Sequence, residues 1–173
     1  MAESYLTLGA SVAMSKAEMN SFLEQKLLAR FTSIRPDGYP HTTPLWYIWD
    51  GEVLWFFLGA GVHPRQHIRN LEQNPKLCVV IDRDARLEHG GLFDAQGVVI
   101  RGTGEVSTDE KLQEGIGQKV LRKYLGVEGE QYVEAALGDG KPGKNRVIVK
   151  VRPEQIVTWD FRKGQGAGGS ETA

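Results

Sequence analysis

Hydrophobic and polar residues alternate, or hydrophobic residues run continuously, over short stretches that glycine, proline, asparagine and aspartate separate. Stretches of this kind, rich in β-branched and aromatic residues, are typical of strands. The sequence predicts strands at residues 27–34, 41–49, 52–58, 76–82, 97–106, 146–151 and 155–161. Turn signals at Pro36-Asp37-Gly38 and Asp50-Gly51 join the first three strands as tight hairpins, which makes them antiparallel.

Other segments show the 3.6-residue period of helices. Ser15 followed by Glu18 has the S-x-x-E spacing of a capping box, and it places a short amphipathic helix at residues 16–25. Further helices are predicted at residues 63–73, 108–124 and 128–137. Six or seven antiparallel strands with few helices indicate a mainly β protein, a small barrel with flanking helices.

The pattern also sets the organisation of the chain. Residues 1–14 are weakly patterned and are expected to form an N-terminal arm. Residues 15–163 are expected to form one domain, and a chain of 173 residues is long enough for a domain of this kind to bury a core. The glycine- and serine-rich tail, residues 164–173, is expected to be disordered.

Composition and charge exclude several classes of protein. There are 21 Lys and Arg against 22 Asp and Glu, so the chain lacks the basic excess of a general nucleic-acid binder. The most apolar run, residues 54–62, is far shorter than the roughly 20 residues of a membrane span, and no secretory signal is visible. We expect a cytoplasmic protein that binds neither nucleic acid nor membrane. The single cysteine, Cys78, is expected to be a small hydrophobic residue of a buried strand.

A basic cluster, residues 63–69, lies where a glycine-rich turn leaves a strand and a helix begins. Free N–H groups at a helix start attract anions, and arginine adds a planar fork suited to phosphate. Arg65 and Arg69 are one helical turn apart and can share a face. The cluster is either a phosphate clamp or a solvated basic turn, and these residues alone do not decide between them. His63 and His67 have helical spacing but no acidic third ligand nearby, so we expect no metal site.

The strand around Thr43, Pro44, Leu45 and Trp46 is a second candidate site. Pro44 has no N–H to give to a ladder, so it belongs at a sheet edge or a bulge, where backbone groups can meet a ligand. Thr43 offers a hydroxyl and Trp46 a flat apolar face, on which a planar heteroaromatic ring could rest. An ordinary edge strand with a core tryptophan is the simpler interpretation of the same residues.

In their order and spacing, three stretches resemble the pyridoxamine 5'-phosphate oxidase-like, FMN-binding split β-barrel superfamily. They are residues 29–47, 65–75 and 146–161, within a region from about Leu27 to Lys163. The resemblance implies a six-stranded antiparallel split β-barrel with flanking helices. It also implies a homodimer with a cofactor in each of two grooves at the interface between the subunits.

The resemblance further implies which residues hold the cofactor. Arg65 stands at the family's arginine in the phosphate motif, His67 replaces its usual lysine, and Arg69 adds a second guanidinium. Residues 43–46 would lie along the ring system, and Trp159 would approach the ring from the partner chain.

The implied function is a flavin-dependent oxidoreductase that binds FMN and transfers hydride to or from a small organic substrate. The nearest alternative is a reductase that depends on the deazaflavin coenzyme F-420, whose acidic tail Lys141, Lys144 and Arg146 could hold. FAD or haem in the same groove is a further alternative. The chain could also be a non-catalytic flavin- or haem-binding protein with His63 or His67 as an axial ligand, or a structural dimer with an empty groove.

Overall fold

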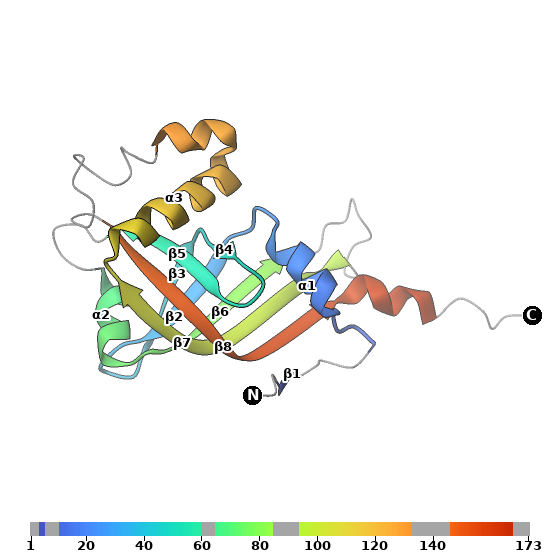
Figure 1. Ribbon diagram of the computed structural model, residues 1–173. Helices are drawn as coiled ribbons and strands as arrows, with labels where there is room; N and C mark the ends of the chain where they lie inside the picture. Colours follow the sequence, from blue (N-terminus) through green and yellow to red (C-terminus); the bar gives the residue numbers. More distant parts are fainter. Residues whose placement is uncertain (1–3, 6–10, 60–64, 85–93, 133–145, 168–173) are drawn as a thin grey trace, which may run out of the picture.

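One curled sheet forms the centre of the structure, with helices at both ends and along one side (Figure 1). The computed structural model describes residues 4–5, 11–59, 65–84, 94–132 and 146–167. Its strands are β1 (Ser4–Tyr5), β2 (Ala29–Ile34), β3 (Pro40–Leu45), β4 (Ile48–Trp49), β5 (Leu54–Gly59), β6 (Lys76–Arg83), β7 (Gln96–Ser107) and β8 (Arg146–Asp160). Its helices are α1 (Lys16–Leu23), α2 (Gln66–Gln73) and α3 (Glu110–Leu125), with the 3₁₀ helices η3 (Val127–Tyr132) and η4 (Phe161–Ala167).

The strand order is β3-β2-β6-β7-β8-β5-β4, and each strand pair along this path is antiparallel. The short β1 lies outside the path and pairs in parallel with β8. The two edge strands, β3 and β4, follow each other in the chain, and only Trp46 and Tyr47 connect them. No strand pairing joins β3 to β4 among the described residues, so the barrel is split along this line. The predicted class, a mainly antiparallel β structure with flanking helices, is confirmed.

The number of strands differs from the six that were expected, because the path holds seven. Residues 41–49 do not form one strand: β3 ends at Leu45, and β4 begins at Ile48. Tyr47, between them, is fully buried. The chain therefore turns inward at this point and leaves one edge of the sheet for the other.

The last two predicted strands, residues 146–151 and 155–161, form the single strand β8. Pro153 was expected to separate them, but it pairs with Gly102 next to a bulge at Glu154, where β8 has one residue more than β7. A bulge tolerates the missing N–H of a proline. A Cβ atom at Gly102 would overlap the carbonyl oxygen of Arg152, so the close approach of β7 and β8 requires glycine here.

Aliphatic and aromatic side chains fill the centre of the barrel, and α1 packs at one end of it. Phe31 on β2 and Phe56 on β5 meet edge to face, with ring centroids 5.1 Å apart. The predicted capping box of α1 is present, since Glu18 N donates to Ser15 Oγ at 3.3 Å and Ser15 N donates to Glu18 Oε2 at 2.6 Å. The buried face of α1 consists of Met19, Phe22 and Leu23, as the periodicity predicts.

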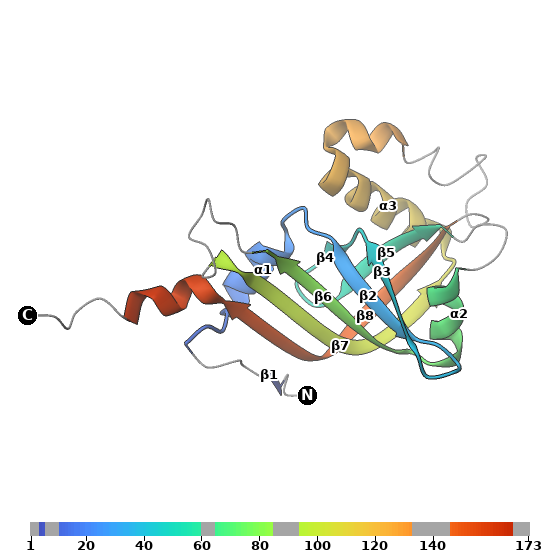
Figure 2. The same ribbon diagram turned by 180° about the vertical axis from the view of Figure 1, so that it is seen from behind.

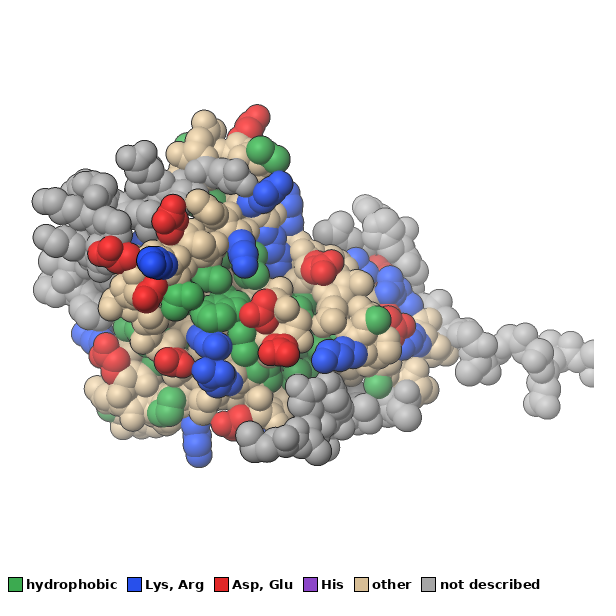
Figure 3. Space-filling view, in the orientation of Figure 1, with side chains coloured by type: hydrophobic (Ala, Val, Ile, Leu, Met, Phe, Trp, Pro, Cys, Tyr) green, Lys and Arg blue, Asp and Glu red, His purple; other side chains and the backbone are tan. Residues whose placement is uncertain are grey.

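The other two α-helices cover different parts of the barrel (Figures 1 and 2). α2 lies against β2, β3 and β7, and Asn70 on its buried face donates to Ser33 Oγ at 2.9 Å. α3 covers β4, β5 and β8, where Ile116 and Val120 pack with Ile148 in a second hydrophobic cluster. Figure 3 shows hydrophobic side chains gathered on the surface below this helix.

The predicted N-terminal arm, residues 1–14, is tied to β8 where the structure describes it. Asp160 N donates to Val12 O at 2.8 Å, and Met14 N donates to Thr158 Oγ1 at 3.0 Å. Met14 is also part of the main core. This end of the arm is therefore integrated into the fold.

The predicted start of the disordered tail, residue 164, lies within a 3₁₀ helix of the structure. Residues 164–167 belong to η4, while residues 168–173 lie outside the described residues. Lys163 Nζ donates to Ala13 O at 2.8 Å, which ties the helix to the arm. Local composition gives no sign of this contact, because Lys163 and Ala13 are 150 residues apart in the sequence.

Candidate functional site

Two arginines converge at one end of the barrel, above the last residue of β5. Arg65 is the N-cap of α2, and Arg146 is the first residue of β8. Both guanidinium groups approach Gly59, where a Cβ atom would stand 3.1 Å from Arg65 Nη2 and 3.2 Å from Arg146 Nη1. A side chain at this position would crowd both groups, so the glycine leaves the space that they occupy.

Positive charge is concentrated at this point. The side chain of Arg65 does not cap α2, and the first N–H groups of a helix carry a partial positive charge of their own. Burial, and in second place the charge of Arg65, lowers the pKa of the Arg146 guanidinium. Arg146 also lies over the ring of Phe57, with its Cζ 5.1 Å from the ring centroid. Like charges held close together repel each other, and an anion between them offsets that repulsion.

The chemistry of this donor set fits a phosphate monoester. Each guanidinium presents planar N–H donors that match two phosphate oxygens, and the start of α2 adds backbone donors. Within the described part of the chain, Arg65 forms no ion pair with a carboxylate. Of the two interpretations left open by the sequence, these contacts favour the phosphate clamp over a basic turn paired with surface carboxylates.

Arg69, the other arginine predicted for the clamp, contacts its own helix. Its side chain is exposed, and Arg69 Nη2 donates to Gln66 Oε1 at 2.8 Å. Gln66 Nε2 in turn donates to Asn70 Oδ1 at 2.6 Å. The structure therefore places Arg65 beside Arg146, and a role for Arg69 in phosphate binding stays a prediction.

His67 is on the buried face of α2, with only 2% of its surface exposed. Its ring is edge to face with Phe31 at 6.1 Å and stacked with His41 at 6.4 Å. Burial, followed by the charges of Arg65 and His41, lowers the pKa of His67 to about 4. Nε2 is buried and has no hydrogen-bond partner among the described residues. A neutral ring in this position brings no positive charge to a phosphate, and it presents little surface to a haem.

The segment from Thr43 to Trp46 lies on the edge strand β3 and the start of its connection to β4. The edge position that Pro44 predicted is confirmed, and Pro44 is exposed. Thr43 is half-buried, with Oγ1 3.3 Å from Nε2 of His41. Leu45 is buried in the main core. Trp46 is 38% exposed, so it is not the core tryptophan of the simpler interpretation.

Trp159 lies far from the two arginines. It is the penultimate residue of β8, which Arg146 begins, and a 15-residue strand corresponds to about 45 Å of extended chain. Its indole lies against Gly97 on β7, where a Cβ atom would overlap the ring. Figures 1 and 2 show α2 and η4 at opposite ends of the barrel. Arg65 and Trp159 of one subunit do not meet in one site.

The sequence identified some residues of this region and missed others. Arg146 was named only as a contact for the tail of F-420, because nothing in the sequence indicates that the start of β8 adjoins Arg65. Tyr124 on α3 was missed, although it stacks on Trp46 with ring centroids 4.7 Å apart. His63, Lys141 and Lys144 lie outside the described residues.

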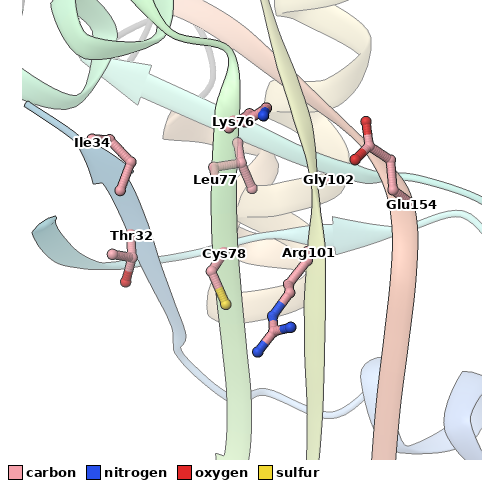
Figure 4. Close-up of a pocket in the computed structure, with 8 residues that line it drawn as sticks. All are labelled: Thr32, Ile34, Lys76, Leu77, Cys78, Arg101, Gly102 and Glu154. Carbon is pink, nitrogen blue, oxygen red and sulfur yellow. The ribbon is translucent and has the colours of Figure 1, made fainter. Parts of the chain in front are cut away.

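A separate cavity of about 270 Å³ lies on the face of β2, β6 and β7 that carries Cys78 (Figure 4). Cys78 lines it together with Thr32 and Arg101. The expected burial of the cysteine in the core is wrong, because it is half-buried and faces this cavity. Burial raises the pKa of the thiol, an effect that Arg101 opposes. None of the predicted cofactor-binding residues lines the cavity.

The described residues include no group of three or more His, Cys, Asp or Glu side chains placed to hold a metal ion. None of the helices that they form is both long and apolar enough to cross a membrane.

The structure is a split β-barrel in which two arginines converge near the start of a helix. The family model described as pyridoxamine 5'-phosphate oxidase matches residues 15–160, and the chain belongs to this family. No curated protein matches the chain.

Solved structures share the fold of this chain. A conserved hypothetical protein from Mycobacterium tuberculosis is 25% identical with a TM-score of 0.76, and the match covers 95% of this chain and 96% of that one. An F-420 reductase is 27% identical with a TM-score of 0.57, covering 79% of this chain and 94% of that one. A FAD-binding protein from Mesorhizobium loti is 23% identical with a TM-score of 0.59, covering 83% and 93%. The family model is thus named for an oxidase, and an F-420 reductase and a FAD-binding protein share the fold.

Proposed function

We propose that this chain is an oxidoreductase that uses a phosphorylated flavin or deazaflavin coenzyme, with the coenzyme phosphate between Arg65 and Arg146. The convergence of the two guanidinium groups over Gly59 carries this proposal. Two like charges lie side by side near a helix start, and burial, followed by the charge of Arg65, lowers the pKa of Arg146, which favours an anion at this site. FMN, the leading candidate, ends in a phosphate group that could occupy this site.

The bound coenzyme would supply the hydride transfer, and the protein would bind and orient it. Arg65 and Arg146 would fix its phosphate end. The edge strand β3 would lie along the ring system, where Thr43 offers a hydroxyl, exposed Pro44 leaves the strand edge without an N–H, and Trp46 offers an aromatic face. From His41 to Trp46 this edge spans about 17 Å. An extended molecule with a phosphate at one end and a ring at the other suits such an edge.

Coenzyme F-420 is the second candidate, and two observations favour it. The chain is 27% identical to an F-420 reductase over 94% of that protein. Arg146 provides a second cation beside Arg65. The acidic tail of F-420 is longer than a single phosphate and would need such a second cation. FAD and haem are weaker candidates, since His67 is buried and the likeness to the FAD-binding protein concerns the fold.

The proposal includes a homodimer, in which a second copy would supply Trp159 to the coenzyme site. Within one chain, Trp159 and Arg65 lie at opposite ends of the barrel. Trp159 can contact the same coenzyme as Arg65 only if a second copy supplies it. Size-exclusion chromatography with light scattering should therefore give a dimer, and a monomer that still binds the coenzyme at full affinity would rule out this arrangement.

Titration of the purified protein with FMN and with F-420, followed by the quenching of coenzyme fluorescence, tests the function. Arg65→Ala and Arg146→Ala should each weaken binding by about 1.5–3 kcal/mol, the range for a hydrogen bond to a charged group, or roughly 10- to 150-fold. Arg69→Ala, on the same helix, is the matched control and should have a smaller effect. Failure of the wild-type protein to bind either coenzyme would disprove the proposal.

The coenzyme-free protein offers an independent check of the clamp. Because Arg65 and Arg146 repel each other, Arg65→Ala should leave the free energy of unfolding unchanged or slightly raise it, while it weakens coenzyme binding. Urea unfolding without coenzyme measures the first effect. A variant that loses stability and affinity together would indicate a structural arginine rather than a ligand-binding one.

A further inference from the structure

Trp46 and Tyr124 form a parallel aromatic stack where the chain crosses from one edge of the barrel to the other. Their ring centroids are 4.7 Å apart, and their planes differ by 4°. Trp46 is the first residue after β3, and Tyr124 lies near the end of α3. Parallel stacking at this separation is a favourable geometry for two aromatic rings.

Tyr124 is held in place by hydrogen bonds to two different segments. Its hydroxyl donates to Leu27 O at 2.6 Å, and it accepts a longer bond from Tyr47 N at 3.4 Å. The neighbouring Lys123 donates to Leu23 O at 2.8 Å, with Nζ 3.7 Å from the centroid of the Tyr47 ring. These contacts fix the ring of Tyr124 relative to the segment before β2 and to the connection between β3 and β4.

Trp46 differs from Tyr124 because it remains 38% exposed. One face of the indole packs on the ring of Tyr124. The indole follows directly on Pro44 and Leu45, the end of the edge strand assigned to the coenzyme ring. A flat, exposed and rigidly backed aromatic surface at this point is suited to stack on another planar ring.

We propose that Tyr124 is a positioning residue, which holds the indole of Trp46 in the plane needed to stack on the ring system of the coenzyme. This inference rests on the proposed function. Without Tyr124 the indole would be free to change rotamer, and binding would have to immobilise it. Tyr124 thus acts through Trp46, without touching the coenzyme.

A double-mutant cycle distinguishes this role from a general structural one. Tyr124→Leu and Trp46→Leu should each weaken the binding of FMN or F-420 by about 2- to 10-fold, the range expected for one aromatic pair. The double variant should bind no more weakly than Trp46→Leu alone, because Tyr124 has nothing left to position. Tyr124→Phe keeps the stack without the hydroxyl and should bind between the wild type and Tyr124→Leu. Tyr132→Leu, an exposed tyrosine on η3, is the matched control and should bind as the wild type does.

Near-ultraviolet circular dichroism of the coenzyme-free variants reports on the stack itself. We expect Tyr124→Leu to reduce the tryptophan signal and Tyr124→Phe to preserve most of it, with far-ultraviolet spectra unchanged. Should Tyr124→Leu fail to fold, Tyr124→Phe with Trp46→Leu forms the same cycle.

The outcomes separate this inference from the proposed function. If the wild type binds a coenzyme but Tyr124→Leu binds equally well, or if the two single effects add in the double variant, the positioning role is wrong and the proposed function stands. If the wild type binds neither FMN nor F-420, the proposed function is wrong and the positioning role falls with it. Single effects with no further loss in the double variant support both.

Discussion

Acidification from pH 7 to pH 5 should weaken the fold through one buried side chain, His67. Its imidazole, on the buried face of α2, contacts the rings of Phe31 and His41, and 2% of the residue is exposed. Burial is the main reason that its pKa falls from the ordinary 6.5 to about 4. The folded protein therefore keeps His67 neutral at a pH where the unfolded chain protonates it.

The size of the effect follows from this difference in pKa. Between pH 6.5 and pH 4 the unfolded chain binds a proton at His67 that the folded chain does not, so the free energy of unfolding falls as the pH falls. One pKa unit corresponds to about 1.36 kcal/mol, and the loss from pH 7 to pH 5 is about 2 kcal/mol. The lowered pKa of Glu18, about 2 against an ordinary 4.5, contributes stability that is lost mainly at lower pH. The interval from pH 7 to pH 5 thus reports chiefly on His67.

Urea unfolding of the wild type and His67→Leu at the two pH values measures this contribution. The wild type should lose about 2 kcal/mol more than His67→Leu between pH 7 and pH 5. His41→Gln, which changes the half-buried neighbouring ring, is the control and should keep most of the pH dependence. Equal losses in the wild type and His67→Leu would refute the reasoning.

Two further predictions concern packing and capping. Gly97→Ala places a methyl group against the indole of Trp159 and should lower the free energy of unfolding by about 1–3 kcal/mol. Gly115→Ala, in an open position of α3, should raise the free energy of unfolding by about 0.5–1 kcal/mol. Denaturant titration measures both changes. Ser15→Ala removes the hydroxyl that caps α1 and should cost about 1 kcal/mol in the same assay, while Ser15→Thr should retain most of the stability.

Much of the barrel could be predicted from local patterns. The strands at 52–58, 76–82 and 97–106 correspond to β5, β6 and β7, because each is an apolar or alternating run between clear turn signals. The capping box at Ser15 and Glu18 was also correct, since both of its hydrogen bonds are local. These features depend on residues within a few positions of one another.

The errors lie where distant segments decide the outcome. The strand at 41–49 is broken because Tyr47 turns into a core that other strands build. Pro153 stays within β8 because the bulge beside it, at Glu154, interrupts the regular pairing with β7.

The candidate site shows the same division. Arg65 at the start of α2 was predictable from a glycine-rich turn followed by a helix. Its neighbour Arg146 follows it by 81 positions, and only the pairing of β5 with β8 brings the two together above Gly59. The burial of His67 likewise depends on which face of α2 meets the sheet.

The two edge strands, β3 and β4, are not hydrogen-bonded to each other in the described part of the chain, so the barrel can open locally along the seam between them. The sheet is continuous from β3 through β6 and β7 to β4, so parting its two margins breaks no strand ladder and exposes only the side chains that bridge them. Amide hydrogen exchange should therefore be faster along these margins than in the central strands β6 and β7. A ligand bound across this seam would hold the two edge strands together. Its binding should slow amide exchange in β3 and β4 and leave exchange in β6 and β7 unchanged.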